Sequence, residues 1–231
     1  MKLYTFLFVL ITPYISVSQE DYYDNQELRY ENHIYRDDIK TAQVHLFGDP
    51  LSAPIIELND NKQLQLSFDD LSRELKDYYY TFIHCDANWQ PSDLVQNEYI
   101  EGFHEEMLFE NDYSRNTIET YINHRIVFPN ENMQITKSGN YIIYIYEDGD
   151  RDIPIITYRF MVTENLLTIN AKVRPGGGAQ ERFYNQTVNF TLNSPNYELT
   201  NPYEDLQVFI LQNQRWDTKL GPIDPAFVKG N

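Results

Sequence analysis

His84, Cys85 and Asp86 are consecutive in the sequence, and their side chains have the most obvious capacity for chemistry. A histidine, a cysteine and a carboxylate could act as base, nucleophile and orienting group in covalent hydrolysis. These residues end the aromatic and β-branched run Tyr78–Cys85, which predicts a strand. Because neighbouring residues on a strand point to opposite faces, the side chains of His84 and Cys85 are not expected to meet. We therefore expect no catalytic residues here, and we expect Cys85 to be a small buried packing residue.

Trp89 lies three residues after Asp86, in a segment that breaks the strand and turns through Pro91. We expect its large ring to be mostly buried, as an anchor in the core or at the rim of a β-sandwich. The alternative is that Trp89 and Trp216, the two tryptophans of the chain, are stacking platforms for a glycan. Exposed and coplanar rings on one surface would favour the glycan, whereas inward-packed rings would favour the core.

Two carboxylate pairs, Asp69-Asp70 and Glu105-Glu106, could in principle act as general acid and general base. Such a pair is defined by the separation of its carboxyl groups in space, which a sequence does not contain. We therefore expect both pairs to lie in solvated loops. A hydrolase would also need a concave pocket in which such groups converge.

Asp148, Asp150 and Asp152 resemble the first ligands of a calcium-binding loop. Ile153 stands where this loop requires a glycine, and Arg159 stands where it requires a glutamate, so we expect a hairpin tip instead. The histidines also lack the spacing of a metal site. They are His33, His45, His84, His104 and His124. We expect neither a metal nor any other cofactor.

The composition excludes several classes of function. The 231 residues include 35 Asp and Glu but only 18 Lys and Arg, which gives a net charge of −17. This charge disfavours binding to nucleic acid and to anionic membranes, because both need clustered basic residues. The one cysteine cannot form an internal disulfide. Aromatic residues make up 15% of the chain, which favours an all-β fold.

Residues 1–18 have the pattern of a secretory signal peptide. Lys2 supplies the positive charge, residues 3–15 form an apolar run, and Ser18 ends a small-x-small cleavage site. The apolar run is shorter than the roughly 20 residues that span a bilayer, so we expect no membrane insertion by this chain. The mature protein is expected to begin at Gln19 and to be exported.

Runs with strand character follow one another at regular spacing, separated by turn signals. The expected strands are residues 41–47, 55–58, 63–68, 78–85, 118–128, 141–146 and 155–162. The alternation places Leu64, Leu66 and Phe68 on one face of their strand. It likewise places Ile118, Ile122, Ile126 and Phe128 on one face of a later strand. Seven such runs predict an immunoglobulin-like antiparallel β-sandwich within residues 19–165.

Turn residues agree with this prediction. Asp148-Gly149 is typical of a tight hairpin turn. Gly139 precedes Tyr141 by two residues at the start of a late strand, as in the tyrosine corner of immunoglobulin-like domains. In that motif the tyrosine hydroxyl binds back to the chain, so we expect the same of Tyr141.

The composition changes after residue 165. Residues 174–178, Arg-Pro-Gly-Gly-Gly, predict a linker or a hairpin rather than a phosphate-binding loop, because no Lys-Ser/Thr pair or helix follows them. Strands are expected at 187–192 and 206–211. These are too few to enclose a core. We therefore expect residues 166–231 to be the start of a second β domain, truncated relative to a longer protein.

Seven motifs resemble those of the plug protein family of the type IX secretion system. They occur in order along most of the expected mature chain, and the one that ends at Trp89 is the most distinctive. The motifs are IKT (39–41), PIIEL (54–58), LSFDDL (66–71), YYTFIHCDANW (79–89), SGNY (138–141), RFMV (159–162) and QNQRWD (212–217).

The resemblance implies a periplasmic subunit that binds the outer-membrane translocon barrel and closes its periplasmic end. It implies no catalytic residues, no cofactor and no small-molecule substrate. The motif residues are accordingly expected to be structural. They are Asp69, Asp70, Tyr80, His84, Cys85, Asp86, Trp89, Gly139 and Tyr141. The alternative is a periplasmic β-sandwich module that binds a glycan or another ligand.

Overall fold

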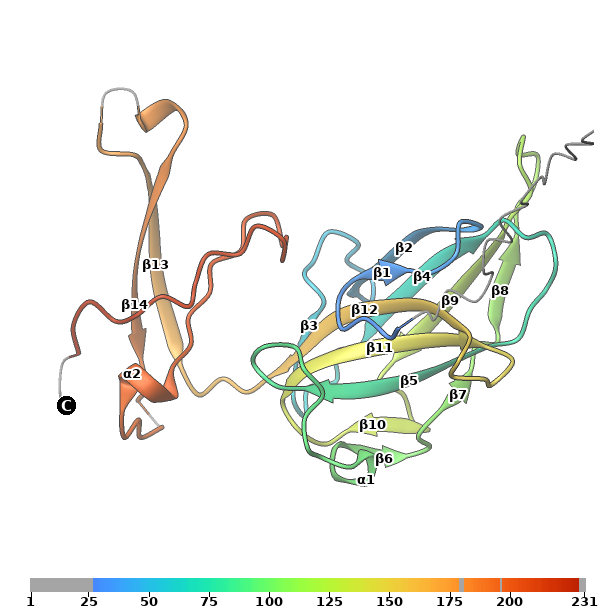
Figure 1. Cartoon of the computed structure of the whole chain (residues 1–231), viewed down its shortest axis with the longest axis horizontal. Coiled ribbons are helices and arrows are strands. Elements are labelled where there is room, and N and C mark those ends of the chain that lie inside the picture. Colours follow the sequence, from blue (N-terminus) through green and yellow to red (C-terminus); the bar gives the residue numbers. More distant parts are fainter. Residues whose placement is uncertain (1–26, 179–180, 196, 229–231) are drawn as a thin grey trace, which may run out of the picture.

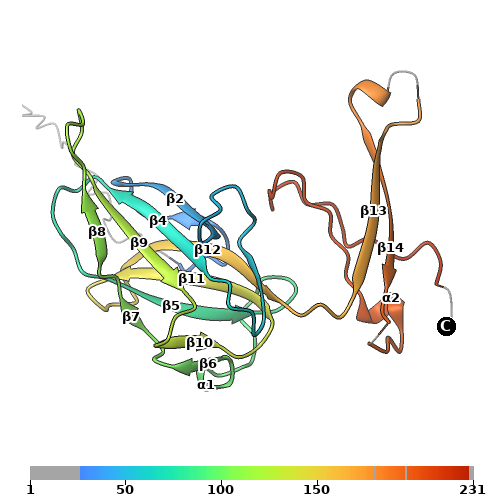
Figure 2. The ribbon, with the colours of Figure 1, turned by 180° about the vertical axis from the view of Figure 1, so that it is seen from behind.

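The computed structural model describes residues 27–178, 181–195 and 197–228. Two β-sheets lie face to face, and a separate hairpin stands to one side of them (Figure 1). Figure 2 shows the same arrangement from behind. The all-β prediction is therefore confirmed. The expected signal peptide, residues 1–18, lies outside the described residues.

One sheet has six strands. Its strands in order are β1 (His33–Ile34), β12 (Pro154–Thr163), β11 (Gly139–Glu147), β5 (Tyr78–Cys85) and β7 (Glu106–Met107). The sixth strand, β3 (Ile55–Glu57), pairs with β12 in parallel, whereas the other pairs are antiparallel. The sheet is therefore antiparallel except at this edge, where β1 and β3 both pair with the outer side of β12.

The second sheet has four strands and covers one face of the first. Its strands in order are β2 (Ile39–Leu46), β4 (Leu64–Asp70), β9 (Ile122–Phe128) and β8 (Glu110–Tyr113). Short elements close one side of the sandwich. They are the helix α1 (Gln96–Tyr99) and the paired strands β6 (Ile100–Gly102) and β10 (Met133–Ile135).

The main core lies between the two sheets. Leu64, Leu66 and Phe68 of β4 are all fully buried, as their alternation predicted. The ring of Phe82 on β5 lies 5.3 Å from that of Phe128 on β9, so aromatic rings join the two layers. Ile118 departs from the prediction: it is fully exposed in the loop before β9, and its strand begins only at residue 122.

The second segment, residues 166–228, contains one hairpin, and the strand predicted at 187–192 is confirmed as part of it. Strand β13 (Thr168–Pro175) was not predicted, and it pairs with β14 (Gln186–Asn193) over their full lengths. Residues 174–178 run from the end of β13 into the connection, where the 3-10 helix η1 (Glu181–Phe183) follows. The strand expected at 206–211 is wrong, since only the bridge between Ile210 and Leu220 forms, after helix α2 (Pro202–Asp205).

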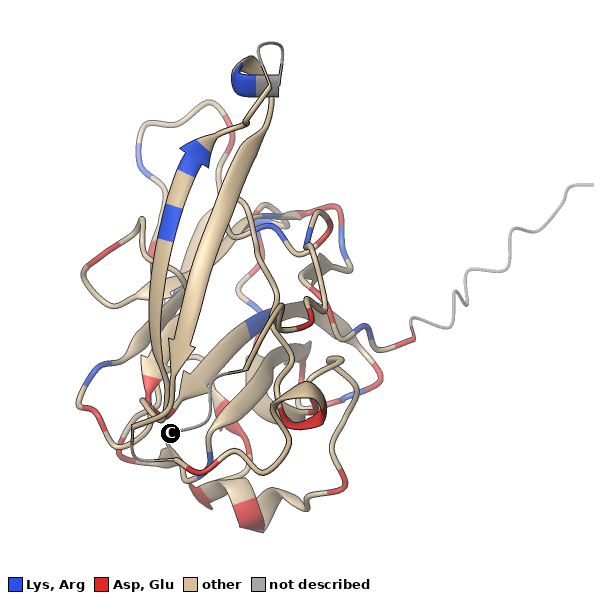
Figure 3. Cartoon of the chain, turned by 90° about the vertical axis from the view of Figure 1, so that its left-hand side faces the viewer, with Lys and Arg blue, Asp and Glu red and all other residues tan. Residues whose placement is uncertain are grey.

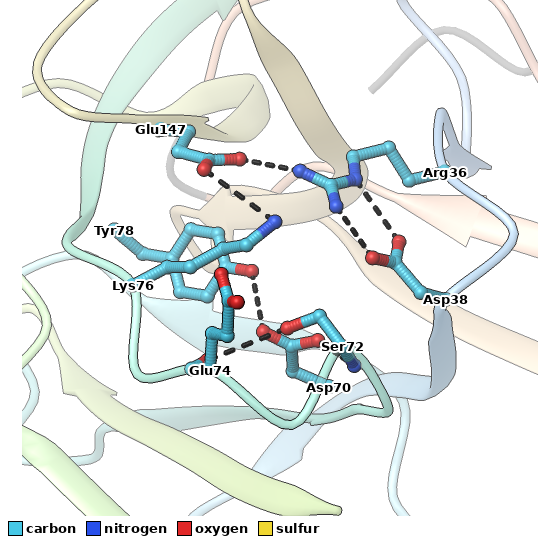
Figure 4. Close-up of polar contacts among 8 residues, drawn as sticks. All are labelled: Arg36, Asp38, Asp70, Ser72, Glu74, Lys76, Tyr78 and Glu147. Atoms are coloured by element: carbon cyan, nitrogen blue, oxygen red, sulfur yellow. Dashed lines mark hydrogen bonds and ion pairs between the residues drawn. The ribbon is translucent and has the colours of Figure 1, made fainter.

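Arg36 anchors the segment before β2 to one end of the sandwich (Figure 4). Its guanidinium donates hydrogen bonds to Asp38 and to Glu147, the last residue of β11. Lys76 Nζ lies 3.5 Å from the other Glu147 oxygen. Burial raises the pKa of Asp38, but the bond from Arg36 outweighs it and holds the pKa below its usual value. This network joins three segments that are distant in sequence.

Asp70 is fully buried, which corrects the expectation of a solvated loop for Asp69-Asp70. Asp70 Oδ2 accepts a hydrogen bond of 2.7 Å from the Tyr78 hydroxyl, and Oδ1 accepts one of 2.7 Å from the Ser72 backbone N–H (Figure 4). These donors replace the water that the carboxylate loses on folding. Asp69, on the opposite face of β4, accepts hydrogen bonds from the side chains of Asn123 and Thr41.

Tyr141 and Gly139 form the turn that the tyrosine-corner pattern predicted. The Tyr141 hydroxyl donates a hydrogen bond of 2.8 Å to the carbonyl oxygen of Lys137, four residues upstream. Gly139 has a φ of +150° and lies against the His84 imidazole, where an added Cβ would be 2.4 Å from Nε2. A glycine is therefore required at this position by both conformation and space.

We expect Gly139→Ala to lower the free energy of unfolding by about 2 to 4 kcal/mol, because it adds backbone strain to a steric clash. Urea denaturation followed by circular dichroism measures this loss. The double variant His84→Ala/Gly139→Ala should regain stability relative to the sum of the single changes, since it removes the clashing ring. A Gly139→Ala protein as stable as the parent would contradict this account.

We also expect stability to fall as the pH drops below about 6.5, because His124 is buried against Phe68 and its Nε2 has no hydrogen-bond partner among the described residues. Burial lowers the pKa of His124, although the Asp70 charge opposes this. The unfolded chain therefore takes up the proton first, and the loss is at most about 1.4 kcal/mol per pH unit. His124→Phe should reduce this slope in urea titrations at pH 5 to 7. An unchanged slope in His124→Phe would contradict it.

Candidate functional site

A second apolar cluster covers the outer face of the six-stranded sheet, opposite the main core. Its buried members are Cys85, Trp89, Ile142, Tyr144 and Tyr146. Side chains from both ends of the described chain pack against it. They include Leu28 and Tyr30 before β1, and Trp216 from the second segment. We call this group the outer cluster, and it is the site where distant parts of the chain meet.

The loop after β5 is folded so that Trp89 turns back onto this face. One oxygen of Asp86 accepts hydrogen bonds of 2.8 Å from the backbone N–H groups of Asn88 and Gln90. Trp89 itself has a φ of +63°, in the left-handed region. Its side chain is 2% exposed, as predicted for an anchor. The role of Asp86 in this structure is therefore to hold the loop that places Trp89.

Arg159 of β12 contacts both tryptophans. Its guanidinium carbon is 4.5 Å from the Trp89 ring centroid and 5.3 Å from that of Trp216. The two indole rings are 4.9 Å apart at an interplanar angle of 77°. The arrangement combines an edge-to-face aromatic pair with a cation–π contact to each ring.

The Arg159 side chain is fixed by the segment before β1. Nε and Nη2 donate hydrogen bonds of 2.8 and 2.6 Å to the Tyr30 carbonyl oxygen, and the Arg159 backbone N–H donates one of 2.8 Å to Asn32 Oδ1. Burial lowers the pKa of Arg159, and the Glu31 charge acts in the opposite direction. The guanidinium remains charged at neutral pH, because arginine does not lose its proton in proteins.

A cleft of about 730 Å³ opens beside this stack, between β12 and residues 211–217. The lining includes Glu31, Asn32, Tyr158, Arg159, Trp216 and Asp217. Charges of both signs thus surround the Arg159 end of the cleft.

His84 and Cys85 lie on opposite faces of β5, as their adjacency predicted. His84 Nδ1 lies 2.7 Å from Ser92 Oγ, and its ring contacts that of Tyr141 edge-on. Cys85 belongs to the outer cluster and is 2% exposed. Burial raises the pKa of the Cys85 thiol to about 12, and the nearby Asp86 charge adds to this shift. A thiol at neutral pH, turned away from the imidazole, cannot act as a nucleophile with it.

The side chains of Tyr80, Glu106 and Asn130 form a hydrogen-bond network beside strand β7. The Tyr80 hydroxyl and Asn130 Nδ2 both donate hydrogen bonds to Glu106 Oε2. Burial raises the pKa of Tyr80, and the bond to Glu106 raises it further. Burial also raises the pKa of Glu106, but these donors outweigh it and hold the pKa below its usual value. The expectation of a solvated loop is wrong for Glu106, which lies in β7, while Glu105 is exposed.

The side chains of the site make packing, cation–π and hydrogen-bond contacts with one another. In residues 27–178, 181–195 and 197–228, no three His, Cys, Asp or Glu side chains form a group suited to a metal ion. In the same ranges, no helix has the length and apolar character needed to cross a membrane. The tryptophan rings are steeply inclined and Trp89 is buried, so they do not form a flat platform for a glycan.

Sequence reasoning identified Trp89 but missed Arg159 and Tyr30 as its partners. Arg159 is the one charged residue of strand β12. A single charge in an otherwise uncharged strand indicates a buried or stacked cation. The partner carbonyl of Tyr30 belongs to the backbone, and no side-chain pattern reveals it.

We expect Trp89→Ala to lower the free energy of unfolding by about 3 to 5 kcal/mol, because it empties a large buried site. Chemical denaturation of the purified protein measures the change. Tyr184→Ala provides a matched control, since this aromatic side chain is 90% exposed and its loss should cost less than about 0.5 kcal/mol. An unchanged Trp89→Ala transition would mean that the ring is not buried in solution.

The comparison with protein families gives one match. A model described as the type 9 secretion system plug protein 1st domain matches residues 39–164, which span β2 to β12. No curated protein matches the sequence.

Solved structures also resemble this chain, among them the following two. The crystal structure of a hypothetical protein from Parabacteroides merdae ATCC 43184 has a TM-score of 0.82 and 32% sequence identity, and the match covers 89% of this chain. It covers 52% of that chain, so this chain spans about half the length of the solved protein. The Pseudomonas fluorescens alkylpurine DNA glycosylase AlkC bound to DNA containing an abasic site analog has a TM-score of 0.28 and 8% identity, over 54% of this chain and 30% of that one. This second likeness carries no argument.

The family model follows the sandwich from the start of β2 to the residue after β12. The match includes the loop that places Trp89 and the strand that carries Arg159. Since it covers more than half of the sequence, the chain belongs to the type 9 secretion system plug protein family.

Proposed function

We propose that this protein is a non-enzymatic plug subunit of the type IX secretion system. It binds the outer-membrane translocon barrel and closes the periplasmic end of the barrel when no substrate is in transit. The observation that carries the proposal is the family match across residues 39–164. The proposed location is the periplasm, in association with the outer membrane, after export by the signal peptide expected at residues 1–18.

The chemistry of the described side chains supports a binding role. The groups that first suggested catalysis serve the fold itself: Asp86 holds a loop, Asp70 binds Tyr78, and Cys85 packs against the sheet. A plug needs a rigid surface and has no reaction to perform. Preorganised sandwich surfaces suit this task, because little conformational entropy is lost when they bind.

The distribution of charge supports a partner with basic residues around its opening. Between residues 39 and 164, 22 Asp and Glu accompany 9 Lys and Arg, whereas residues 166–231 contain 6 of each. Figure 3 shows the acidic positions spread over the loops of the sandwich and basic positions on the hairpin. The sandwich therefore carries most of the negative charge. Complementary charge on the barrel would speed association and select the partner more than it would raise affinity.

The glycan-binding alternative receives no support from the site. A sugar-stacking surface needs an accessible aromatic face, but Trp89 is 2% exposed and stands at 77° to Trp216. A translocon subunit remains the function that the family and the chemistry of the site support best.

We expect deletion of the gene to leave a hole in the outer membrane. Cells should become permeable to solutes and antibiotics too large for ordinary porins, because the barrel then lacks its closure. Uptake of a large antibiotic or a membrane-impermeant dye measures the leak. The full-length gene supplied in trans should restore the barrier.

The decisive comparison is the double deletion of plug and barrel. Permeability should return to normal when both are removed, since the leak requires the pore itself. A leak that persists without the barrel would overturn the proposal and favour a role in envelope integrity. Normal permeability in the single deletion would likewise overturn sealing by this subunit.

A further inference from the structure

The second segment returns to the sandwich after its hairpin. Figures 1 and 2 show β13 and β14 standing apart from the sheets, while a later loop, red in both views, extends back toward β12. This loop comprises residues 211–217 and lines the cleft beside Arg159. Trp216 is the member of residues 166–228 that packs against the outer cluster.

The contact is made by aromatic and cation–π interactions. Trp216 meets the Trp89 ring at 4.9 Å and the Arg159 guanidinium at 5.3 Å. Arg159 is already held by the Tyr30 carbonyl, so the receiving surface belongs to the sandwich and does not depend on the loop. The sandwich thus presents a preformed site for one indole ring.

Polar bonds contribute little to this docking. Arg215 and Asp217, on either side of Trp216, pair with each other. Within the part of the chain that the structure describes, no hydrogen bond or ion pair joins residues 211–217 to the sandwich. The loop is therefore attached through its tryptophan and not through a polar network.

The shape of the loop is set by its own backbone. Ile210 and Leu220 exchange two backbone hydrogen bonds of 2.9 Å, which close the loop at its base. Asn213 and Gln214 both have positive φ angles, of 53° and 59°, so the chain reverses before Trp216. Because these features are internal to the second segment, the loop can keep its shape when it leaves the sandwich.

We propose that Trp216 is a releasable latch, which docks the second segment onto the Trp89–Arg159 surface of its own sandwich. One partly buried indole and one cation–π contact stabilise the docked state far less than the two-sheet core stabilises the sandwich. Undocking therefore precedes unfolding. Release uncovers the face of Trp89 and widens the cleft, and the angle between the two segments is then free to change.

Exciton-coupled circular dichroism tests the latch directly. The chain has two tryptophans, so a couplet between indole transitions reports their close contact. The native full chain should show the couplet, and urea should abolish it at a lower concentration than the one that abolishes the far-ultraviolet β-sheet signal. Absence of the couplet in native buffer, or its loss in one transition together with the sheet signal, would overturn the proposal.

Arg159→Lys distinguishes the cation–π contact from general packing. Lysine keeps the charge but lacks the flat guanidinium, so docking should weaken by about 2- to 10-fold and the couplet should disappear at lower urea. Any effect on the sandwich is read separately from the sheet transition in the same sample. Arg125→Lys, a change at an exposed pair with Asp112, should move neither transition. If the couplet is half lost at the same urea concentration in Arg159→Lys and in the parent, the assigned role of Arg159 is contradicted.

Trp216→Leu provides a second test that leaves the sandwich residues intact. Trp89 is then the one remaining indole. Acrylamide should quench its fluorescence more strongly than it quenches the buried Trp89 of the parent, because the loop no longer covers the ring. Tyr203→Leu, in the exposed helix α2 of the same segment, should leave the quenching of the two-tryptophan protein unchanged. If Trp89 in Trp216→Leu is as well protected from acrylamide as the buried Trp89 of the parent, the loop does not cover the Trp89 ring, and the proposal is overturned.

Discussion

The need to bury both faces of the six-stranded sheet governs this structure. Residues 141–146 of β11 are all buried, so neither side of the strand faces water. The four-stranded sheet covers one face, as in an ordinary sandwich. Within the part of the chain that the structure describes, the other face is covered by single side chains from distant segments and not by a third sheet; among them are Tyr30, Trp89 and Trp216. These segments are placed where they are because the outer face of β11 must be covered.

Covering a sheet in this way brings polar groups into places that water cannot reach. Several of them have a specific partner: Asp70 bonds to Tyr78, Glu106 bonds to Tyr80, and the Arg159 guanidinium contacts a backbone carbonyl and two rings. Buried carboxylates beside tyrosines can look like the start of an active site. Here the Asp70 and Glu106 carboxylates accept hydrogen bonds from Tyr78 and Tyr80, so these groups satisfy one another within the fold.

The same constraint links structure to the proposed role in secretion. A subunit that closes a pore must hold its shape while docked and must also be able to leave. The sandwich provides rigidity through a core that joins two sheets, and it carries most of the negative charge of the chain. The second segment joins the sandwich through the connection after β12 and through Trp216 on the outer cluster, the contact that we propose is releasable. A rigid body with a movable attachment is suited to reversible closure.

The sequence by itself determined the strands and the faces of their side chains. Alternation in β4 and the unbroken run of β5 predicted these strands closely, and adjacency alone separated His84 from Cys85, because strand geometry is local. Its motifs also indicated the family. Strand β13 and the start of β9 at Ile122, instead of at Ile118, escaped prediction, since an exposed hairpin and a fully exposed isoleucine carry patterns that packing does not enforce. The tertiary structure alone decided that Asp70 is buried and that Arg159 contacts both Trp89 and Trp216. The contacts among Arg159, Trp89 and Trp216 join residues 57 to 127 positions apart, and no local pattern encodes them. The burial of Asp70 depends on the second sheet packing over the first.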